Sequence, residues 1–182
     1  QAQINQLLVQ YAAAGKLIVR LKGGDPCIFA RSGEELAVLA EHNIKFELVS
    51  GVTAASACAA FAGISLTHRD YASQVLFLSG HSKNGKLEVN WQSVQPSGQT
   101  LVFYMGLNVL AEISASLIKL GINVDTPAML VEKVSAPDAR AIGAPIAKLA
   151  VAVQQQSVPF ISPCLLIVGE VVKLAVGYQS YR

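Results

Sequence analysis

The chain has 182 residues, of which 52% are hydrophobic and only 14% are charged, and its formal net charge is +2. This length accommodates one ordinary domain, or a small domain with part of another, around a substantial core. The small charge gives no argument for nucleic-acid binding, and no apolar run reaches the roughly 18 to 20 residues of a membrane-spanning helix, so we expect a soluble protein with buried strands.

The first residues, QAQINQLLVQYAAAGK, lack the basic start, apolar stretch and cleavage site of a secretory signal. We therefore expect a cytoplasmic protein. The cysteines Cys27, Cys58 and Cys164 stand far apart in apolar or small-residue surroundings, which favours buried free thiols over disulfides. No Cys-x-x-Cys or paired-histidine spacing supports zinc, so we expect no metal site.

A first helix is predicted from apolar residues at helical spacing, with Gly15 at its end. These residues are Ile4, Leu7, Leu8 and Tyr11. The run from Lys16 to Leu21 then has the composition of a strand in a parallel sheet that is covered on both faces.

The loop that follows, Gly23-Gly24-Asp25-Pro26, leads to a second predicted helix. Ser32 can cap this helix and Glu35 can reach back to it, as in a capping box. Its buried face is expected to hold Leu36, Leu39 and Ala40.

Lys45 to Val49 is the next predicted strand, and Ser50 to Thr53 turns it into a helix of small residues that ends at Gly63. Small side chains permit the close approach of another backbone or a ligand. The order helix, strand, helix, strand, helix is typical of a parallel α/β layer.

We place a domain boundary within residues 66 to 74, which divides the chain into 1–70 and 71–182. The second part is predicted to be another α/β unit, with an amphipathic helix that ends at Gly121. Its predicted strands are 75–78, 100–104, 128–131, 140–142 and 165–168, its predicted helices are 107–120 and 146–155, and a polar segment with Trp91 spans 81–99.

The glycine pair has two interpretations. Strand-to-helix loops often need glycine for structural reasons alone, but open α/β sheets also bind ligands at the carboxyl ends of their strands. Neither G-x-G-x-x-G nor a Walker motif is present, so phosphate is not the favoured ligand. The loops SGVTAAS and Tyr104-Met105-Gly106 also end strands, and three such loops suggest a cleft between two domains.

Four stretches of the sequence resemble the tetrapyrrole methylase family, and most closely its members that act on uroporphyrinogen III. They are RLKGGDPCIFARSGEE, SGVTAASACAAFAGISLTHRDYASQVLFLSGH, VFYMGLNVLAEI and PCLLIVGEVV. The resemblance implies two α/β domains with a cleft between them for S-adenosylmethionine, and an assembly that is usually a homodimer. The implied reaction is C-methylation of uroporphyrinogen III to precorrin-2, on the way to sirohaem or cobalamin.

Carried over by position, the resemblance implies that four loops contact the cofactor. The family's usual Glu-Asn-Gly-Thr loop becomes Glu132-Lys133-Val134-Ser135 here, so its contact requires that the backbone keep its course despite the Val134 side chain. The implied cofactor-binding residues are Gly23, Gly24, Asp25, Ile28, Thr53, Ala54, Met105 and Val134.

Family members begin with a strand and a Gly-x-Gly-Pro-Gly-type loop, and their proposed acid and base residues also precede the helix that opens this chain. We therefore expect the first domain to be incomplete and the chain to be a truncated form, and we assign no catalytic residue. The substrate is rich in carboxylates, which favours cations at the cleft mouth, although a solvated surface is the preferred interpretation of each candidate. The candidates are Arg31, His68, Arg69, His81 and Lys83.

His68-Arg69-Asp70 has a second interpretation, an ion-pair knot at the domain junction. Two alternatives to the implied function also stay open. One is a methylase of a later corrin precursor; the other is an inactive fragment that only binds ligand or dimerises.

Overall fold

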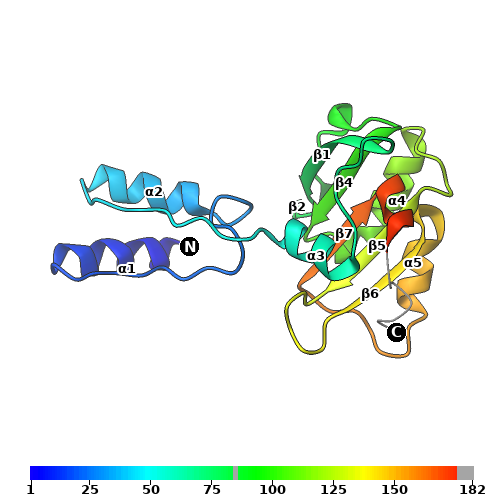
Figure 1. Ribbon diagram of the computed structural model, residues 1–182. Helices are drawn as coiled ribbons and strands as arrows, with labels where there is room; N and C mark the ends of the chain where they lie inside the picture. The colour runs from blue at the N-terminus through cyan, green and yellow to red at the C-terminus, as the bar shows by residue number, and fades with distance from the viewer. Residues whose placement is uncertain (84–85, 176–182) are drawn as a thin grey trace. The chain divides into compact units, whose positions relative to one another are not determined.

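The computed structural model describes residues 1–83 and 86–175. It divides into two compact units, Gln1–Thr53 and Ala54–Arg182 (Figure 1). The division falls before helix α3 (Ala54–Ala62), because α3 packs against strand β7 (Cys164–Val168) of the second unit. The boundary that the sequence places at residue 70 does not coincide with this division, and as a boundary between domains it stays a prediction.

The first unit contains the two predicted helices. Helix α1 (Ala2–Ala13) packs against α2 (Ser32–Glu41). Gly15, in the left-handed region at φ +72°, follows the end of α1 as expected. Leu36 and Leu39 of α2 are half-buried, whereas Ala40, which we expected on the buried face, is exposed.

The two strands predicted in the first unit, 16–21 and 45–49, are wrong. Both segments are extended but belong to no sheet, and the side chain of Leu17 is 97% exposed. A strand exists only through hydrogen bonds to a neighbouring strand, and none of the described residues supplies one to either segment. The parallel α/β layer expected here is therefore not formed by the described residues.

The predicted capping box of α2 is also wrong. The helix is preceded by Arg31 in the left-handed region at φ 58°, and no side chain caps it. The Ser32 hydroxyl instead donates a hydrogen bond to the carbonyl of Pro26. Glu35 turns away from the helix start and pairs with Lys22.

The second unit is built on one five-stranded sheet with the order β1-β4-β7-β5-β6. Only β1 and β4 are parallel neighbours in it; the other three pairings are antiparallel. The strands not yet placed are β1 (Ala72–Ser79), β4 (Gly98–Tyr104), β5 (Pro127–Glu132) and β6 (Arg140–Pro145). All five strands predicted in this part of the chain are confirmed, and each is longer than predicted.

Helices cover both faces of this sheet (Figure 1). Helices α4 (Leu110–Lys119) and α5 (Ile146–Gln154) pack on the face that carries Leu101 and Phe103. Helix α3 and the 3-10 helix η3 (Glu170–Leu174) pack on the face that carries Val102. This alternation along β4 is the period of two that a strand buried on both faces requires.

The polar segment before β4 folds as a short hairpin followed by a 3-10 turn. The hairpin pairs β2 (Ser82–Lys83) with β3 (Lys86–Leu87), and η1 (Trp91–Ser93) follows. A further 3-10 turn, η2 (Leu107–Val109), leads into α4. The helices predicted at 107–120 and 146–155 are therefore both confirmed, as η2 with α4 and as α5.

The cysteines are all free, as expected, but only Cys58 is buried; Cys164 is half-buried and Cys27 is exposed, against the expectation that all three are buried. Burial raises the pKa of the Cys58 and Cys164 thiols to about 12, which keeps both protonated and unreactive at neutral pH. No group of His, Cys, Asp or Glu suited to a metal occurs among the described residues. None of the described helices is long and apolar enough to cross a membrane.

Candidate functional site

The two glycine-containing loops of the first unit touch each other. A Cβ atom added to Gly51 would lie 3.1 Å from the carbonyl carbon of Gly24, and closer still to its oxygen. Gly24 itself has φ +83°, a conformation that favours glycine. Backbone contact between the loops thus gives a structural reason for Gly51 and for Gly24, the second glycine of the pair whose two interpretations the sequence left open.

Asp25 ties these two loops together through its carboxylate. One oxygen accepts the N–H of Cys27 at 2.7 Å, and the other accepts the N–H of Gly51 at 3.1 Å. These bonds to Cys27 and Gly51 lower the pKa of Asp25 below its usual 3.8, so the group is ionised at neutral pH. Each oxygen retains a lone pair with which it can accept a further hydrogen bond.

The other predicted residues of this loop are accessible. Gly23 is exposed, and a Cβ added to it would meet no atom within 4 Å. Ile28 is half-buried, and its N–H donates to the carbonyl of Asp25 at 3.3 Å. Gly23 therefore presents open backbone to a ligand, whereas Gly24 is engaged with Gly51.

A buried ion pair that the sequence did not predict lies under the same loop. Lys22 Nζ is 2.7 Å from Glu35 Oε2 and donates to the carbonyl of Ala30 at 2.6 Å. Glu35, only 4% exposed, also accepts hydrogen bonds from Arg20 and Gln1. This network joins the two ends of the loop to α2.

In the second unit the predicted contacts meet at one edge of the sheet. β7 is antiparallel to both β4 and β5, so β4 and β5 run in the same direction, and β1 runs parallel to β4. Their carboxyl ends therefore lie at one edge. Leu165 of β7 pairs with Tyr104 on one side and with Val131 on the other, which places the loops at Met105 and Val134 a few strand spacings apart.

Met105 is the most unusual residue of this edge. It follows β4 directly, has φ 56°, and its side chain is 50% exposed. A non-glycine residue in the left-handed region persists only where its surroundings fix it, and such residues cluster at functional sites. Met105 is therefore a large apolar side chain that the backbone holds toward solvent.

Close backbone contact fixes this turn. A Cβ added to Gly80, the residue after β1, would lie 2.7 Å from Gly106 Cα and 3.0 Å from the Met105 carbonyl oxygen. The Gly80 N–H donates to the carbonyl of Tyr104 at 2.6 Å. Two glycines thus allow the ends of the two parallel strands to touch.

The start of α3 lies at the same edge. The Tyr104 hydroxyl accepts the N–H of Ala55 at 3.2 Å, which satisfies one of the free donors of the first helical turn. Ala54, the first residue of α3, is half-buried and packs against the core of this unit. Thr53 precedes it as the last residue of the first unit and is half-buried.

The loop after β5 tolerates valine where the family has glycine. Its left-handed residues are Lys133 at φ 49° and Ser135 at φ 72°, and Val134 between them is not left-handed. The Val134 side chain packs against the core cluster under α3. The substitution therefore puts no side chain in a conformation that requires glycine.

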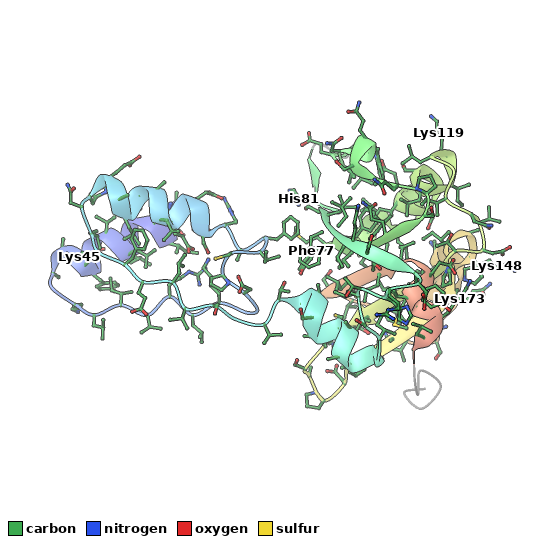
Figure 2. The ribbon with its side chains drawn as sticks, turned by 45° about the horizontal axis from the view of Figure 1, so that its top comes forward. Lys45, Phe77, His81, Lys119, Lys148 and Lys173 are labelled. Atoms are coloured by element: carbon green, nitrogen blue, oxygen red, sulfur yellow. The ribbon has the colours of Figure 1, made fainter. Side chains whose placement is uncertain are left out.

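Two of the five candidates proposed to contact the substrate have local partners. Arg31 pairs with Glu34 at 2.7 Å, and His68 lies 3.8 Å from Asp70 in a turn just before β1. Arg69 is exposed, and the side chain of Lys83 lies outside the described residues. Exposed His81 follows β1 and lies at the side of the second unit away from Lys119, Lys148 and Lys173 (Figure 2).

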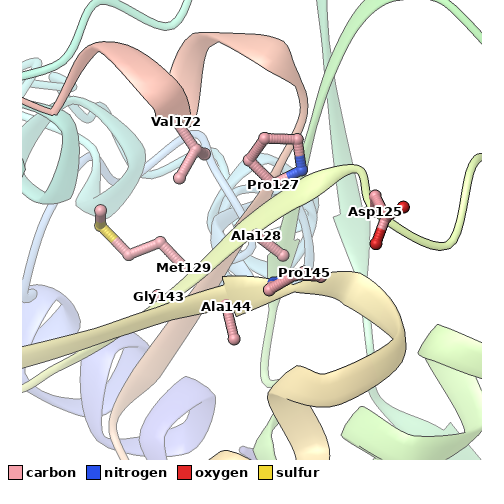
Figure 3. Close-up of a pocket in the computed structure, with 8 residues that line it drawn as sticks. All are labelled: Asp125, Pro127, Ala128, Met129, Gly143, Ala144, Pro145 and Val172. Atoms are coloured by element: carbon pink, nitrogen blue, oxygen red, sulfur yellow. The ribbon is translucent and has the colours of Figure 1, made fainter.

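One shallow pocket of ≈ 230 Å³ does not coincide with any predicted site residue (Figure 3). It lies where β5 begins and β6 ends, opposite the edge that carries Met105. Its lining is apolar apart from Asp125 and comprises Pro127, Ala128, Met129, Gly143, Ala144, Pro145 and Val172. We therefore base the candidate site on the strand-end loops and not on this pocket.

The fold and these loops match one family. Residues 1–150 match the Tetrapyrrole (Corrin/Porphyrin) Methylases, and the chain belongs to this family. The family resemblance that the sequence carries is thereby confirmed, and with it the tetrapyrrole methylase-like α/β fold class.

Curated relatives include two siroheme synthases. That of Pseudomonas fluorescens is 52% identical over 96% of this chain. That of Saccharophagus degradans is 47% identical over the whole of it. The chain spans only 37% and 39% of these two proteins. The uroporphyrin-III C-methyltransferase of Thermus thermophilus, solved with S-adenosylhomocysteine, is 35% identical with a TM-score of 0.81, over 96% of this chain and 75% of that one. A cobalt precorrin-4 methyltransferase, at 21% identity and a TM-score of 0.81, shares the fold.

Proposed function

We propose that the chain is the methyltransferase part of a longer enzyme that transfers methyl groups from S-adenosylmethionine to carbons of uroporphyrinogen III and gives precorrin-2. Membership of the tetrapyrrole methylases and similarity to the Thermus thermophilus enzyme support this reaction. The observation that carries it is the edge of the second unit where β1, β4 and β5 end, with Met105 held outward in a left-handed conformation.

The residues fit the proposed cofactor. S-adenosylmethionine is bulky and cationic at sulfur, and loops of glycine and alanine let such a group lie against backbone atoms. In the first unit we assign the contacts to Gly23, Gly24, Asp25, Ile28 and Thr53. In the second unit we assign them to Ala54, Met105 and Val134.

S-adenosylmethionine would supply an electrophilic methyl group: the electron-rich pyrrole carbon would bond to it as the sulfur–methyl bond breaks, S-adenosylhomocysteine would leave, and the ring system would then lose a proton. The task of the chain is then to align the two reactants and to exclude water. Backbone groups of the glycine loops orient the cofactor, the apolar Met105 side chain shields it from water, and ionised Asp25 keeps the two loops of the first unit joined. Exposed His81, which follows β1, is a candidate donor to a substrate carboxylate.

A second function is favoured by the first unit. Its extended segments 16–21 and 45–49 pair with no strand among the described residues. Such a chain can bind ligand or dimerise without turning over substrate. We also propose that the whole protein acts in the cytoplasm as a homodimer, with no nucleic-acid partner.

Two measurements separate these functions. Titration calorimetry with S-adenosylhomocysteine measures cofactor binding, and a methyl-transfer assay with uroporphyrinogen III measures turnover. Binding and turnover together support the proposal, and binding without turnover supports the second function. A chain that methylates only a later corrin precursor would contradict the substrate, and a chain that does not bind would contradict the site.

A further inference from the structure

A buried ion pair joins the ends of two neighbouring strands at the candidate edge. Glu132 is the last residue of β5 and Arg140 the first of β6, and the two face each other in the antiparallel ladder. Glu132 is only 3% exposed. Its Oε2 accepts a hydrogen bond from Arg140 Nε, and its Oε1 accepts the N–H of Ile161 at 2.8 Å.

Arg140 uses the rest of its guanidinium on the segment that leads into β7. One terminal nitrogen donates to the carbonyl of Val158 at 2.9 Å and the other to that of Pro159 at 2.6 Å. The guanidinium also lies over the Phe160 ring, 4.0 Å from its centroid. The planar fork of arginine suits this combination, which an ammonium group cannot reproduce.

The same segment is tied to the loop after β5. The N–H of Lys133 donates to the carbonyl of Pro163 at 2.9 Å. The loop after β5 is therefore bonded to this segment at two consecutive residues: Glu132 accepts the Ile161 N–H, and Lys133 donates to the Pro163 carbonyl. Two left-handed residues, Lys133 and Ser135, flank Val134 in this loop, and such a backbone persists only when its surroundings fix it.

We propose that Glu132 and Arg140 are positioning residues for S-adenosylmethionine, acting through the backbone of the loop that carries Val134. This inference rests on the proposed function. Neither side chain needs to touch the cofactor. Their role is to hold residues 158–161 and 133–135 as one body, so that the backbone at Val134 meets the ligand without reorganising.

The test is Arg140→Lys, because it keeps a cation beside buried Glu132 and so spares the fold. Lysine cannot bond Glu132, Val158 and Pro159 together or stack flat on Phe160. We expect the dissociation constant for S-adenosylhomocysteine to rise about tenfold or more, since small misplacements of binding groups have effects of this size. The melting temperature should change little, and exchange of the Ile161 amide proton should speed up.

Lys173→Gln is the matched control, because it breaks the exposed pair between Lys173 and Glu170 in the same unit. It should leave binding unchanged. Equal affinity in Arg140→Lys and the parent chain would overturn the positioning role and leave the proposed function intact. A parent chain that does not bind S-adenosylhomocysteine would overturn both.

Glu132→Gln provides a second variant with a distinct signature. Glutamine keeps one oxygen for the Ile161 N–H but loses the charge that pairs with Arg140. Loss of this buried charge should lower the melting temperature, so we expect weaker S-adenosylhomocysteine binding even at temperatures where the variant is fully folded. A loss of affinity that merely follows a loss of folded protein would contradict the proposal.

Discussion

Lys22 Nζ and Glu35 Oε2 lie 2.7 Å apart, with side chains only 10% and 5% exposed, beneath a loop whose own residues are open to solvent. Burial alone would raise the pKa of Glu35, but hydrogen bonds from Lys22, Gln1 and Arg20 outweigh it and lower the pKa. The buried Lys22–Glu35 pair therefore fixes the ends of the loop, while residues of the loop itself remain accessible to solvent.

Replacement of Glu35 by glutamine leaves Lys22 without its buried counter-charge. We expect the free energy of unfolding of the first unit to fall by about 3 kcal/mol, the usual cost of breaking such a pair. Circular dichroism during thermal unfolding and amide exchange in α2 measure it. Glu34→Gln, which breaks the exposed pair with Arg31, is the control and should change little; equal losses in both variants would contradict the assignment.

Acid should destabilise the first unit through the same residue. The folded-state pKa of Glu35 lies below its usual 4.5, so its contribution to stability is fully present above pH 4.5 and is lost as pH falls through the lowered pKa. The pKa of Asp25 is also lowered, so its contribution to stability is likewise lost as pH falls from its usual pKa of 3.8 through the lowered value. Urea unfolding at pH 7 and pH 3 should show this loss, and Glu35→Gln should reduce the difference between the two conditions.

Gly51→Ala tests the contact between the two loops. The added methyl group would meet the Gly24 carbonyl, so the loops must separate, at a cost of about 1–3 kcal/mol that is typical of overpacking. Thermal unfolding measures the cost, and S-adenosylhomocysteine binding should weaken in parallel.

Gly23→Ala is the matched control for this substitution. Its methyl group meets no atom within 4 Å, and its φ is not positive, so the stability should be unchanged. A ligand that lies against Gly23 would nevertheless lose affinity. Similar stability losses at residues 23 and 51 would contradict the assignment of the Gly51→Ala loss to its contact with Gly24.

Leu17→Gln should hardly change the free energy of unfolding. Its side chain is 97% exposed, and surface substitutions usually change the free energy of unfolding by less than about 0.5 kcal/mol. Removal of one of several exposed apolar groups should reduce self-association, as measured by light scattering. Leu8→Gln, at a buried position of α1, should unfold the unit more readily; a large loss at Leu17 would mean that its segment is packed.

The elements predicted most accurately from the sequence are those that depend on local patterns of residues. The apolar spacing in α4 and its Gly121 stop, and the β-branched run of β7, each specify an element within a few residues. Segment 16–21 has an equally clear strand composition, but its pairing depends on residues far away in sequence. Composition alone therefore could not distinguish a paired strand from an extended segment.

The same limit applies to the candidate site. The loops of Gly24 and Met105 are visible in the sequence because glycine after an apolar run marks a turn. Glu35 looked like a helix cap because a cap is a local pattern, whereas its partners Arg20 and Lys22 come from an earlier segment. The joint role of Glu132 and Arg140 likewise emerges only when β5 and β6 are paired.

The position of β7 has a consequence for how the second unit is synthesised and folds. β7 comes last among the five strands in the chain, yet it occupies the middle of the sheet and is the only link between the β1-β4 pair and the β5-β6 pair. Until Cys164–Val168 leave the ribosome, the two pairs have no shared ladder. Closure of this sheet must follow synthesis of β7, and the uncovered edges of β4 and β5 are the surfaces that a chaperone would have to protect in the meantime.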